Sequence, residues 1–568
     1  MRVLLVTLHS KFIHASLALP YLAVYGRKGV DSEINLCEFT VHEPKEQIIA
    51  AILAERPDIL AFSVYIWNRR MTLDVVDAIA TVAPEMEIIL GGPEISFDGP
   101  ELFQRHPGIT GIIRGEGEKP FQEYLQRRSD GIDAAGISRT LWRSGKKLVE
   151  GSFSPPLTDL DAIPSPFAAG LVDLSRGFVY LETSRGCPYQ CSFCMSSLDN
   201  QVRSFSMARI RSDLAFLISR RVPKIKLVDR TFNYDPERAL EIFAFILKNN
   251  QASHFHFEIG ANLLDEPTIR LLQRVPEGMF QFEIGIQSTS AETLKAIRRP
   301  ISPETIADNL VRLRRDTRIS IHLDLIAGLP GEGYRDFLAS VDEVSAFAPH
   351  HLQIEPVKLL PGSPLCCEAR ERGIRFDPNP PYTVLATPSL SFVELEKLRG
   401  LSRLIEMLYN SGTCRRFLDD LAERFGSFSL ALEKLADFWS RRGLFRFPIQ
   451  QRDIFLRLRE FVEEQWSGKE TLPALELLAW ELAHCERPVA ERMVDFFDTV
   501  LSKAEKAAIQ DRIRQETAQA KGTGIKVQYF AAVFSWLTGY RPRTPVLFIY
   551  RTQTGRGMTV EEIRLKAG

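Results

Sequence analysis

The sequence has little of what marks secreted, membrane-spanning or nucleic-acid-coating proteins. Its 568 residues hold only 8 cysteines, too few for a disulfide framework. No run of about 18 apolar residues occurs, so no transmembrane helix is expected. The first residues, MRVLLVTLHS, lack the long apolar region and cleavage site of a signal peptide. We therefore expect a cytoplasmic protein whose reduced thiols are free to bind metal.

The chain also lacks an excess of charge of either sign. The chain has 71 basic and 72 acidic side chains, a formal net charge of −1, so no overall field attracts nucleic acid or acidic lipid. Nucleic acid is accordingly not an expected partner. With 45% hydrophobic and 25% charged residues, the composition is that of a globular protein, and the length predicts about three to four domains.

Residues 1–150 are predicted to form an α/β domain of the doubly wound, Rossmann-like class. Short apolar runs that alternate with helical segments indicate strands at 2–7, 33–38, 59–64, 87–90 and 109–113. Strands that alternate with helices form a parallel sheet, and such sheets bind ligands beyond the carboxyl ends of their strands.

The rest of the chain is predicted to contain a linker and two further domains. Prolines at 155, 156, 164 and 166 indicate a linker over residues 151–174. Residues 175–386 contain six strand–helix units, fewer than the eight of a full TIM barrel, which predicts a partial (β/α)6 barrel. Residues 387–568 have helical spacing and are predicted to be mainly α-helical, with one last strand at 545–550.

The most specific motif is a cysteine triplet, Cys187, Cys191 and Cys194, directly after a predicted strand. A structural zinc site would need a fourth soft ligand, and the nearest following histidine is His254. Three thiolates that leave one iron open fit a 4Fe-4S cluster whose fourth iron binds a substrate or cofactor. The three cysteines are therefore the predicted metal ligands and catalytic centre.

The triplet C-x-x-x-C-x-φ-C, with Phe193 as its aromatic residue, resembles the cluster loop of the radical S-adenosylmethionine enzymes. The segments Val228–Asn233, Gly285–Ser288 ("GxQS") and Asp324–Glu332 ("GLPGE") resemble later segments of that family, in the same order. The resemblance implies a 4Fe-4S cluster, S-adenosylmethionine and its reductive cleavage to a 5'-deoxyadenosyl radical. It also implies contacts to S-adenosylmethionine from Phe193, Arg230, Glu258, Gln287 and Leu329.

A doubly wound domain before such a barrel resembles the cobalamin-binding class of this superfamily. The resemblance rests on the strand-end segments Gly91-Gly92-Pro93-Glu94 and Arg114-Gly115-Glu116-Gly117-Glu118. Glycine lets the backbone approach a large flat macrocycle that side chains would block. The implied cobalamin contacts are Gly91, Gly92, Pro93, Glu94, Gly115, Glu116 and Gly117.

The lower face of the cobalamin is predicted to lack a histidine of the Asp-x-His-x-x-Gly kind. His42 is preceded by Thr40 rather than Asp and followed by Lys45 rather than Gly. The segment 63–68 supplies Ser63, Tyr65 and Trp67, whose aromatic rings could cover that face instead. His9 and His14 flank the first loop and are possible cofactor contacts.

Among family activities, the resemblance favours a cobalamin-dependent methyltransferase that acts on an unactivated carbon of a small molecule. Its implied partners are that substrate and an electron donor such as flavodoxin or ferredoxin. Three alternatives stay open: a cyclase or rearrangement enzyme, an RNA methylthiotransferase, and a cofactor-binding sensor without turnover. Methylthiotransferases carry extra cysteines in the N-terminal domain, where this chain has only Cys37.

Two regions give no clear chemical signal. Cys366 and Cys367 follow the last barrel loop, and a buried turn end is favoured there over a role in hydrogen or methyl transfer. The C-terminal domain shows no catalytic constellation, and we expect it to cap the barrel mouth.

Overall fold

The computed structural model describes residues 1–199, 201–299, 301–488, 496–521, 524–537, 539–540, 542–553 and 556–565. The chain divides into two compact units. Unit 1 comprises 1–336, 347–350 and 355–395, and unit 2 comprises 337–346, 351–354 and 396–568. None of the described helices is both long and apolar enough to cross a lipid bilayer.

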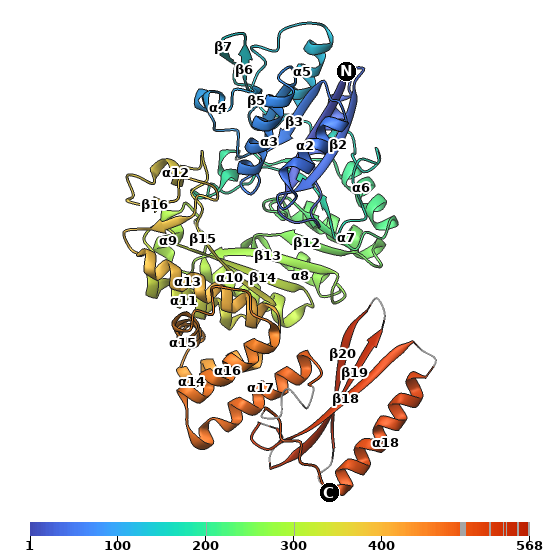
Figure 1. Ribbon diagram of the computed structural model, residues 1–568, viewed down its shortest axis with the longest axis vertical. Coiled ribbons are helices and arrows are strands. Elements are labelled where there is room, and N and C mark those ends of the chain that lie inside the picture. The colour runs from blue at the N-terminus through green and yellow to red at the C-terminus, as the bar shows by residue number, and fades with distance from the viewer. Residues whose placement is uncertain are drawn as a thin grey trace. The chain divides into compact units, whose positions relative to one another are not determined.

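The first domain is built on a seven-stranded sheet with the order β2-β1-β3-β4-β5-β6-β7 (Figure 1). Its elements are β1 (Arg2–His9), α1 (Ala18–Gly26), β2 (Glu33–Thr40), α2 (Lys45–Ala54), β3 (Ile59–Ser63), α3 (Arg69–Val82), β4 (Glu87–Gly91), α4 (Pro100–Arg105), β5 (Ile109–Ile113), α5 (Glu118–Ser129), β6 (Thr140–Ser144) and β7 (Lys147–Glu150). Strands β1 to β5 pair in parallel, as predicted. The sequence interpretation missed β6 and β7, an antiparallel hairpin that extends the sheet beside β5.

Helices cover both faces of this sheet, which confirms the doubly wound class. On one face, Leu19 of α1 and Phe121 of α5 pack on Val3 and Leu5 of β1. On the other face, a second cluster joins apolar side chains of α2, α3 and α4 to the alternate residues of the strands. Because successive strand residues point to opposite faces, continuous apolar runs such as 3–6 contribute to both clusters.

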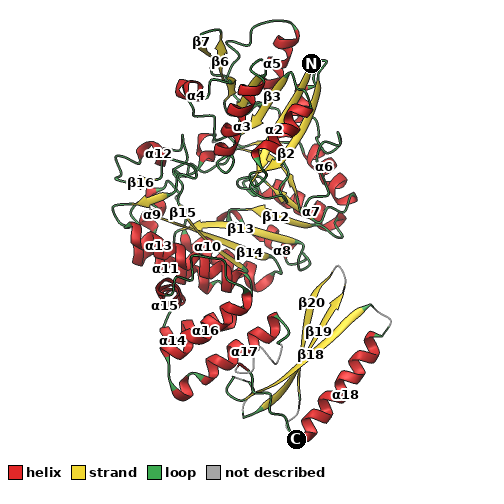
Figure 2. Ribbon diagram, viewed as in Figure 1, coloured by secondary structure: helices red, strands yellow, loops and turns green. Residues whose placement is uncertain are grey.

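The second domain has a six-stranded sheet with the order β15-β14-β13-β12-β11-β8 (Figure 2). Its elements are β8 (Val179–Leu181), α6 (Met207–Ser219), β11 (Lys224–Leu227), α7 (Pro236–Asn249), β12 (His254–Glu258), α8 (Glu266–Leu272), β13 (Phe280–Gln287), α9 (Ala291–Ala296), α10 (Pro303–Asp316), β14 (Ser320–Ala327), α11 (Tyr334–Ala346) and β15 (His351–Pro356). These are the six strand–helix units that the sequence predicts, and the boundary between the units passes through β15.

Local sequence signals explain where the barrel helices begin. Ser206, Asp235, Asp265 and Ser302 each accept a hydrogen bond from the backbone two or three residues into the next helix. Helices α7 and α10 also start with proline, and α8 has proline as its second residue, where the fixed φ of proline suits the first turn.

The barrel strands have an apolar face and a polar face. Phe243 of α7 contacts the rings of Phe257, Phe280 and Phe282, so this face of β12 and β13 packs against the helices. The alternate residues, including His256, Glu258 and Glu283, therefore point to the inner side of the partial barrel.

A short segment follows the barrel, with α12 (Pro364–Glu368), β16 (Arg375–Phe376) and β17 (Val384–Ala386). The favoured interpretation of Cys366 and Cys367 as a buried turn end is wrong. Both lie in α12, where Cys366 is half-buried and Cys367 is exposed. Ser363 caps this helix and Pro364 follows, so the segment starts a helical turn that carries Cys367 into solvent.

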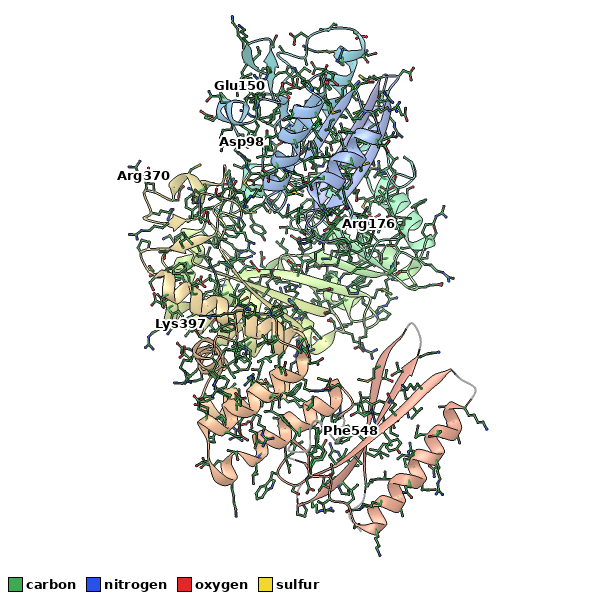
Figure 3. All side chains as sticks on the ribbon, in the orientation of Figure 1. Asp98, Glu150, Arg176, Arg370, Lys397 and Phe548 are labelled. Atoms are coloured by element: carbon green, nitrogen blue, oxygen red, sulfur yellow. The ribbon has the colours of Figure 1, made fainter. Side chains whose placement is uncertain are left out.

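The C-terminal region is helical first and β-rich at its end. Its helices and strands are α13 (Phe392–Leu404), α14 (Arg415–Phe425), α15 (Phe428–Arg441), α16 (Gln451–Gln465), α17 (Leu472–Cys485), α18 (Lys503–Ala520), β18 (Ile525–Phe534), β19 (Thr544–Gln553) and β20 (Arg556–Arg564). Where the sequence predicts one strand at 545–550, an antiparallel sheet of three strands forms with β19 in its centre. The buried strand β19, which includes Phe548 (Figure 3), could be predicted from its apolar run. Its neighbours β18 and β20 mix polar and apolar residues and were not predicted.

Candidate active site

The three predicted metal-binding cysteines lie on one loop beyond β8. Two short paired strands, β9 (Ser184–Arg185) and β10 (Arg203–Ser204), enclose this loop. The Cys187 N–H donates to the Asp199 carbonyl at 3.3 Å, and the Cys194 N–H donates to the Cys191 carbonyl at 3.1 Å. Cys187 and Cys191 are buried and Cys194 is half-buried. The loop is thus closed on itself with its sulfurs largely shielded from water.

Two side chains from elsewhere in the barrel reach the sulfurs. The Arg299 Nη1 lies 3.4 Å from the Cys191 Sγ, and the Thr231 hydroxyl lies 3.4 Å from the Cys187 Sγ. Burial raises the pKa of the Cys191 thiol, and the charge and hydrogen bond of Arg299 oppose that rise. Arg299 therefore favours the thiolate, the form that binds metal.

The three cysteines are the predicted ligands of a cluster rather than of a single ion. Within the part of the chain that the structure describes, no group of three His, Cys, Asp or Glu side chains could hold one metal ion. A cubane cluster binds each thiolate to a different iron, so its ligands stand farther apart than the ligands of a zinc ion. Cys187, Cys191 and Cys194 thus stay the predicted ligands of a 4Fe-4S cluster with one open iron.

The residues predicted to contact S-adenosylmethionine fall into two groups. Arg230 follows β11 and Glu258 ends β12, and both line one cavity. Gln287 ends β13 with a φ of 73°, and its buried Oε1 has no hydrogen bond among the described residues, so it is an acceptor that a ligand could use. Leu329 is fully buried and Phe193 half-buried, and neither of these two residues nor Gln287 is on the wall of that cavity.

Glu258 is an unusual carboxyl. Burial raises its pKa to about 7, and the positive charge of Arg230 opposes the rise. At neutral pH the side chain can therefore either donate or accept a hydrogen bond.

The cavity has a volume of about 750 Å³ and is lined by both domains of unit 1. This volume is typical of small-molecule and cofactor sites, which hold roughly 300–1,000 Å³. The predicted cobalamin contacts on its wall are His9, His14, Ser63, Tyr65, Trp67, Gly91, Gly92, Pro93, Gly115, Glu116 and Gly117. The barrel contributes Tyr180, Glu182, Arg185, Val228, Arg230 and Glu258. Strand ends that are far apart in the sequence thus share one chamber.

At two of the cavity glycines a side chain would not fit. Gly92 has a φ of 106°, and a Cβ there would lie 2.5 Å from the Val64 carbonyl oxygen. Gly115 has a φ of 74°, and a Cβ would lie 2.7 Å from the Arg139 guanidinium. The bare backbone lets both strand-end loops border the cavity closely.

Aromatic rings form another part of the wall. Tyr65 and Trp67 stack with ring centroids 4.6 Å apart and planes within 4° of parallel. The Trp67 indole N–H donates to the Leu8 carbonyl at 3.0 Å, which fixes the pair to the end of β1. A stacked pair held in this way is a flat apolar surface for a macrocycle.

The two predicted histidines line the cavity, and each also contacts another side chain of the protein. His9 Nε2 lies 3.0 Å from a carboxylate oxygen of Glu38. His14 Nδ1 lies 3.0 Å from the Tyr180 hydroxyl, so it links the first domain to β8 of the barrel. Burial lowers the pKa of His14, and the nearby charges of His9 and Lys226 lower it further.

Glu94, predicted to contact cobalamin, does not line the cavity. Its carboxyl accepts a hydrogen bond from the buried Tyr382 hydroxyl and lies 3.6 Å from Arg69. Arg69 in turn pairs with both oxygens of Asp98. In the structure Glu94 therefore takes part in polar contacts with Tyr382 and Arg69 rather than facing the cavity.

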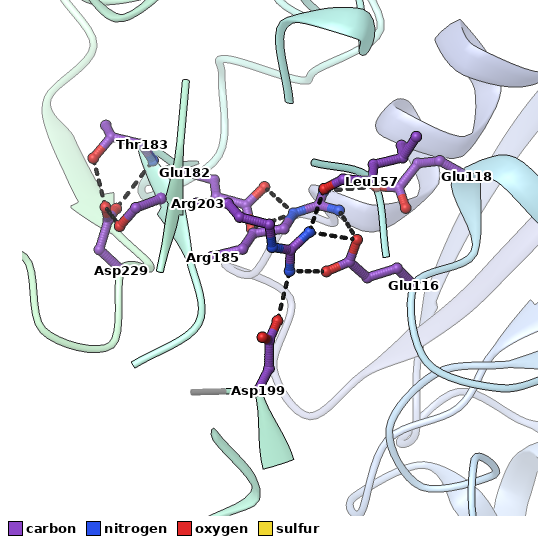
Figure 4. A network of polar contacts seen from close by, with 10 residues as sticks. Glu116, Glu118, Leu157, Glu182, Thr183, Arg185, Asp199, Arg203 and Asp229 are labelled. Carbon is purple, nitrogen blue, oxygen red and sulfur yellow. Dashed lines mark hydrogen bonds and ion pairs between the residues drawn. The ribbon is translucent and has the colours of Figure 1, made fainter. Parts of the chain in front are cut away.

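Sequence reasoning missed an ion-pair network beside the cysteine loop (Figure 4). Arg203 binds both carboxylate oxygens of Glu116, and Arg185 binds Glu118 at 2.6 Å and Glu182 at 3.0 Å. Burial raises the pKa of Glu182 to about 7, although Arg185 opposes this. Glu182 alternates with the buried Leu181, a polar–apolar alternation that could have identified it as an inward-facing residue.

Comparison with known protein families finds three matching segments of the chain. Residues 3–125 match the B12 binding domain, and residues 181–344 match the Radical SAM superfamily. Residues 370–529 match a family described only as a protein of unknown function, DUF4080.

Two curated relatives extend over most of the chain. It is 27% identical to the cobalamin-dependent radical SAM methyltransferase TokK of Streptomyces tokunonensis, over 75% of this chain and 64% of that protein. It is 26% identical to the 2-(S-pantetheinyl)-carbapenam-3-carboxylate methyltransferase of Streptantibioticus cattleyicolor, over 74% of this chain and 66% of that protein. The chain thus spans slightly less than two thirds of either relative.

Solved structures share the fold. The cobalamin-dependent S-adenosylmethionine radical enzyme OxsB, with aqua-cobalamin and S-adenosylmethionine bound, aligns with a TM-score of 0.58 at 15% identity, over 92% of this chain and 81% of that one. TsrM from Kitasatospora setae, with cobalamin and a [4Fe-4S] cluster bound, aligns with a TM-score of 0.55 at 19% identity, over 67% of this chain and 78% of that one.

Proposed function

We propose that this chain, which belongs to the radical S-adenosylmethionine proteins that carry a B12-binding domain, is a methyltransferase that acts on a carbon of a small molecule. The observation that carries the proposal is the shared cavity. Gly92 and Gly115 of the first domain border the same chamber as Arg230 and Glu258 of the barrel. A cofactor on the glycine loops would therefore lie close to a ligand at the carboxyl ends of the barrel strands.

The chain's own residues supply positions for both reactants. Cys187, Cys191 and Cys194 would hold the cluster, and Arg299 would offset the negative charge of the thiolates. When bound, the cluster supplies an electron that splits S-adenosylmethionine into methionine and a 5'-deoxyadenosyl radical, and cobalamin supplies the methyl group.

The cavity residues divide the work of binding. Glu258 on the cavity wall offers a titratable hydrogen-bonding group for a ligand rich in hydroxyl and amino groups, and Gln287, which is not on that wall, offers a buried acceptor at the end of β13. Tyr65 and Trp67 offer a flat apolar wall for the macrocycle. The two domains enclose the chamber from both sides, which helps keep water away from a reactive radical.

The test is the cofactor content of protein purified without oxygen. We expect about four irons and four sulfides per chain, together with one cobalamin, and 5'-deoxyadenosine after reduction in the presence of S-adenosylmethionine. Transfer of a deuterated methyl group from labelled S-adenosylmethionine into a metabolite of a cell extract would identify the acceptor. Iron-loaded protein that binds no cobalamin would contradict the proposal.

The cluster ligands are tested by single replacements. Cys191→Ala should lose the cluster absorption and most of the iron, because a buried three-thiolate site has no spare ligand. Cys367→Ala removes an exposed thiol and is the matched control, with iron content unchanged. Retention of the full cluster by Cys191→Ala would mean that other residues bind it.

A further inference from the structure

The inner face of the barrel carries charged residues below the cofactor cavity. Lys224 and Lys226 of β11 alternate with the buried Ile225 and Leu227, and Lys226 is in register with His256 of β12 and Tyr180 of β8. Since Tyr180 lines the cavity, Lys226 lies on the inner face, next to a residue of its wall.

The acidic groups on this face already have partners. The Glu283 carboxylate lies 2.9 Å from His256 Nε2, and Asp324 lies 3.0 Å from His322 Nε2. Glu182 is bound by Arg185. Burial raises the pKa of Glu258 to about 7, so this carboxyl is only partly charged at neutral pH.

The two lysines differ from these acids. Among the described residues, no carboxylate lies within 4.0 Å of Lys224 or Lys226 in an ion pair, and neither side chain has a hydrogen bond. The Lys226 ammonium instead stands 5.0 Å from the centre of the Phe178 ring. An aromatic ring attracts the cation but is not an ordinary hydrogen-bond acceptor. The N–H donors of Lys226 therefore stay available for a ligand.

Several titratable groups surround the two lysines. His14 and His256 are close enough to Lys226 for its charge to lower the pKa of each, after the larger effect of burial. Burial also lowers the pKa of Lys224, and the positive charge of Lys226 lowers it further, by a smaller amount. The acid that interacts with both lysines is Glu283, whose carboxylate also lies 2.9 Å from His256 Nε2. An entering anion would therefore meet two half-buried cations.

We infer that Lys226, supported by Lys224, binds an anionic group of the substrate, a carboxylate or a phosphate. Lys226 lies inside β11, whereas Arg230 and the other cofactor candidates follow the strand ends. Lys226 is not itself on the wall of the cavity, so a molecule bound there reaches Lys226 only by extending past Tyr180 along the inner face. The inference rests on the proposed function, because it names the substrate class for a site that adjoins the cavity wall at Tyr180.

The test measures the reactivity of Lys226 in the holoenzyme. Acetic anhydride acetylates accessible lysines, and mass spectrometry of the peptides gives the rate at each position. We expect saturating inorganic phosphate or propionate to slow acetylation of Lys226 at least fivefold and to leave the exposed Lys248 unchanged. Protection by phosphate alone indicates a phosphorylated substrate, and protection by propionate alone indicates a carboxylic acid. An unchanged rate at Lys226 with both anions would overturn the inference.

Substitution supplies an independent readout. The thermal stabilisation that the protecting anion gives should be lost in Lys226→Gln and kept in Lys226→Arg, since only the latter retains the charge. If Lys226→Gln is stabilised as much as the wild type, the anion binds elsewhere and the inference fails. Iron and cobalamin content of the same samples report on the proposed function, so the two failures are distinguishable.

Discussion

Glu116 of the first domain and Arg203 of the barrel form a two-oxygen ion pair, with the shorter contact at 2.5 Å. Glu116 belongs to the glycine loop that lines the cavity. Arg203 also binds Asp199, whose carbonyl accepts the Cys187 N–H. The contacts of Arg203 with Glu116 and with Asp199 thus connect the predicted cobalamin loop with the predicted cluster loop.

Replacing Glu116 tests this connection. Burial raises the pKa of Glu116, but the hydrogen bonds and charges of Arg203 and Arg185 outweigh it, and the net pKa is lowered. Glu116→Gln should lower the free energy of unfolding by about 1–3 kcal/mol, as measured by urea denaturation. Because the folded pKa is lowered, the stabilisation is present at neutral pH and is lost as the pH falls below about 4.5.

The control for Glu116 is Glu123, which forms an ion pair with Arg127 one turn along the surface of α5. Glu123→Gln should change stability by less than about 0.5 kcal/mol. Equal effects of the two replacements would show that the Glu116–Arg203 pair contributes no more than a surface pair.

Arg299 is predicted to tune the cluster through its contact with Cys191. Arg299→Gln removes a positive charge beside a thiolate ligand, so the reduced, more negative cluster loses stabilisation. We expect the reduction potential to fall by on the order of tens of millivolts, measured by redox titration with electron paramagnetic resonance. Arg299→Lys keeps the charge and should restore most of the potential. A potential that is the same in all three proteins would rule out this role.

The pH dependence of S-adenosylmethionine binding should follow Glu258. Its pKa is raised to about 7 by burial, so the ionised carboxylate, the stronger acceptor for a ribose hydroxyl, forms as the pH rises through 7. Affinity should therefore increase between about pH 6 and 8, and Glu258→Gln should remove this dependence. Equilibrium dialysis at several pH values measures it, with the exposed Glu237→Gln as control.

The same shift makes a prediction about stability. Between about pH 4.5 and 7 the folded state holds a proton on Glu258 that the unfolded state has released, so stability falls as the pH rises through this window. Glu258→Gln should flatten that part of the pH–stability curve in urea denaturation. An unchanged slope would mean that the carboxyl titrates normally.

Gly92 is predicted to be irreplaceable at the cavity wall. Gly92→Ala forces a φ of 106° on alanine and puts its Cβ 2.5 Å from the Val64 oxygen, so the loop must move. We expect a loss of about 3 kcal/mol or more and reduced cobalamin binding. Gly131 also has a positive φ, of 70°, but open space around it. Gly131→Ala should cost only about 1–2 kcal/mol and leave cobalamin binding intact.

Much of the fold follows from local signals. The alternation of apolar runs and helices predicted the parallel strands β1 to β5 and the six strands of the barrel, because burial on two faces selects those patterns. The hairpin β6–β7 and the outer strands β18 and β20 escaped detection. Their residues are mixed in polarity, and only pairing with a buried neighbour makes them strands.

The sequence by itself identified the cysteine loop, because Cys187, Cys191 and Cys194 lie within one short segment whose spacing predicts a cluster site. The predicted cobalamin contacts, all of which except Glu94 line the cavity, also came from the sequence, because most of them follow the ends of predicted strands. Only the tertiary structure brought Arg299 to Cys191, placed Glu94 behind the cavity wall and joined Glu116 to Arg203. These contacts join residues 87 to 288 positions apart, and such distances close only when sheets and helices pack.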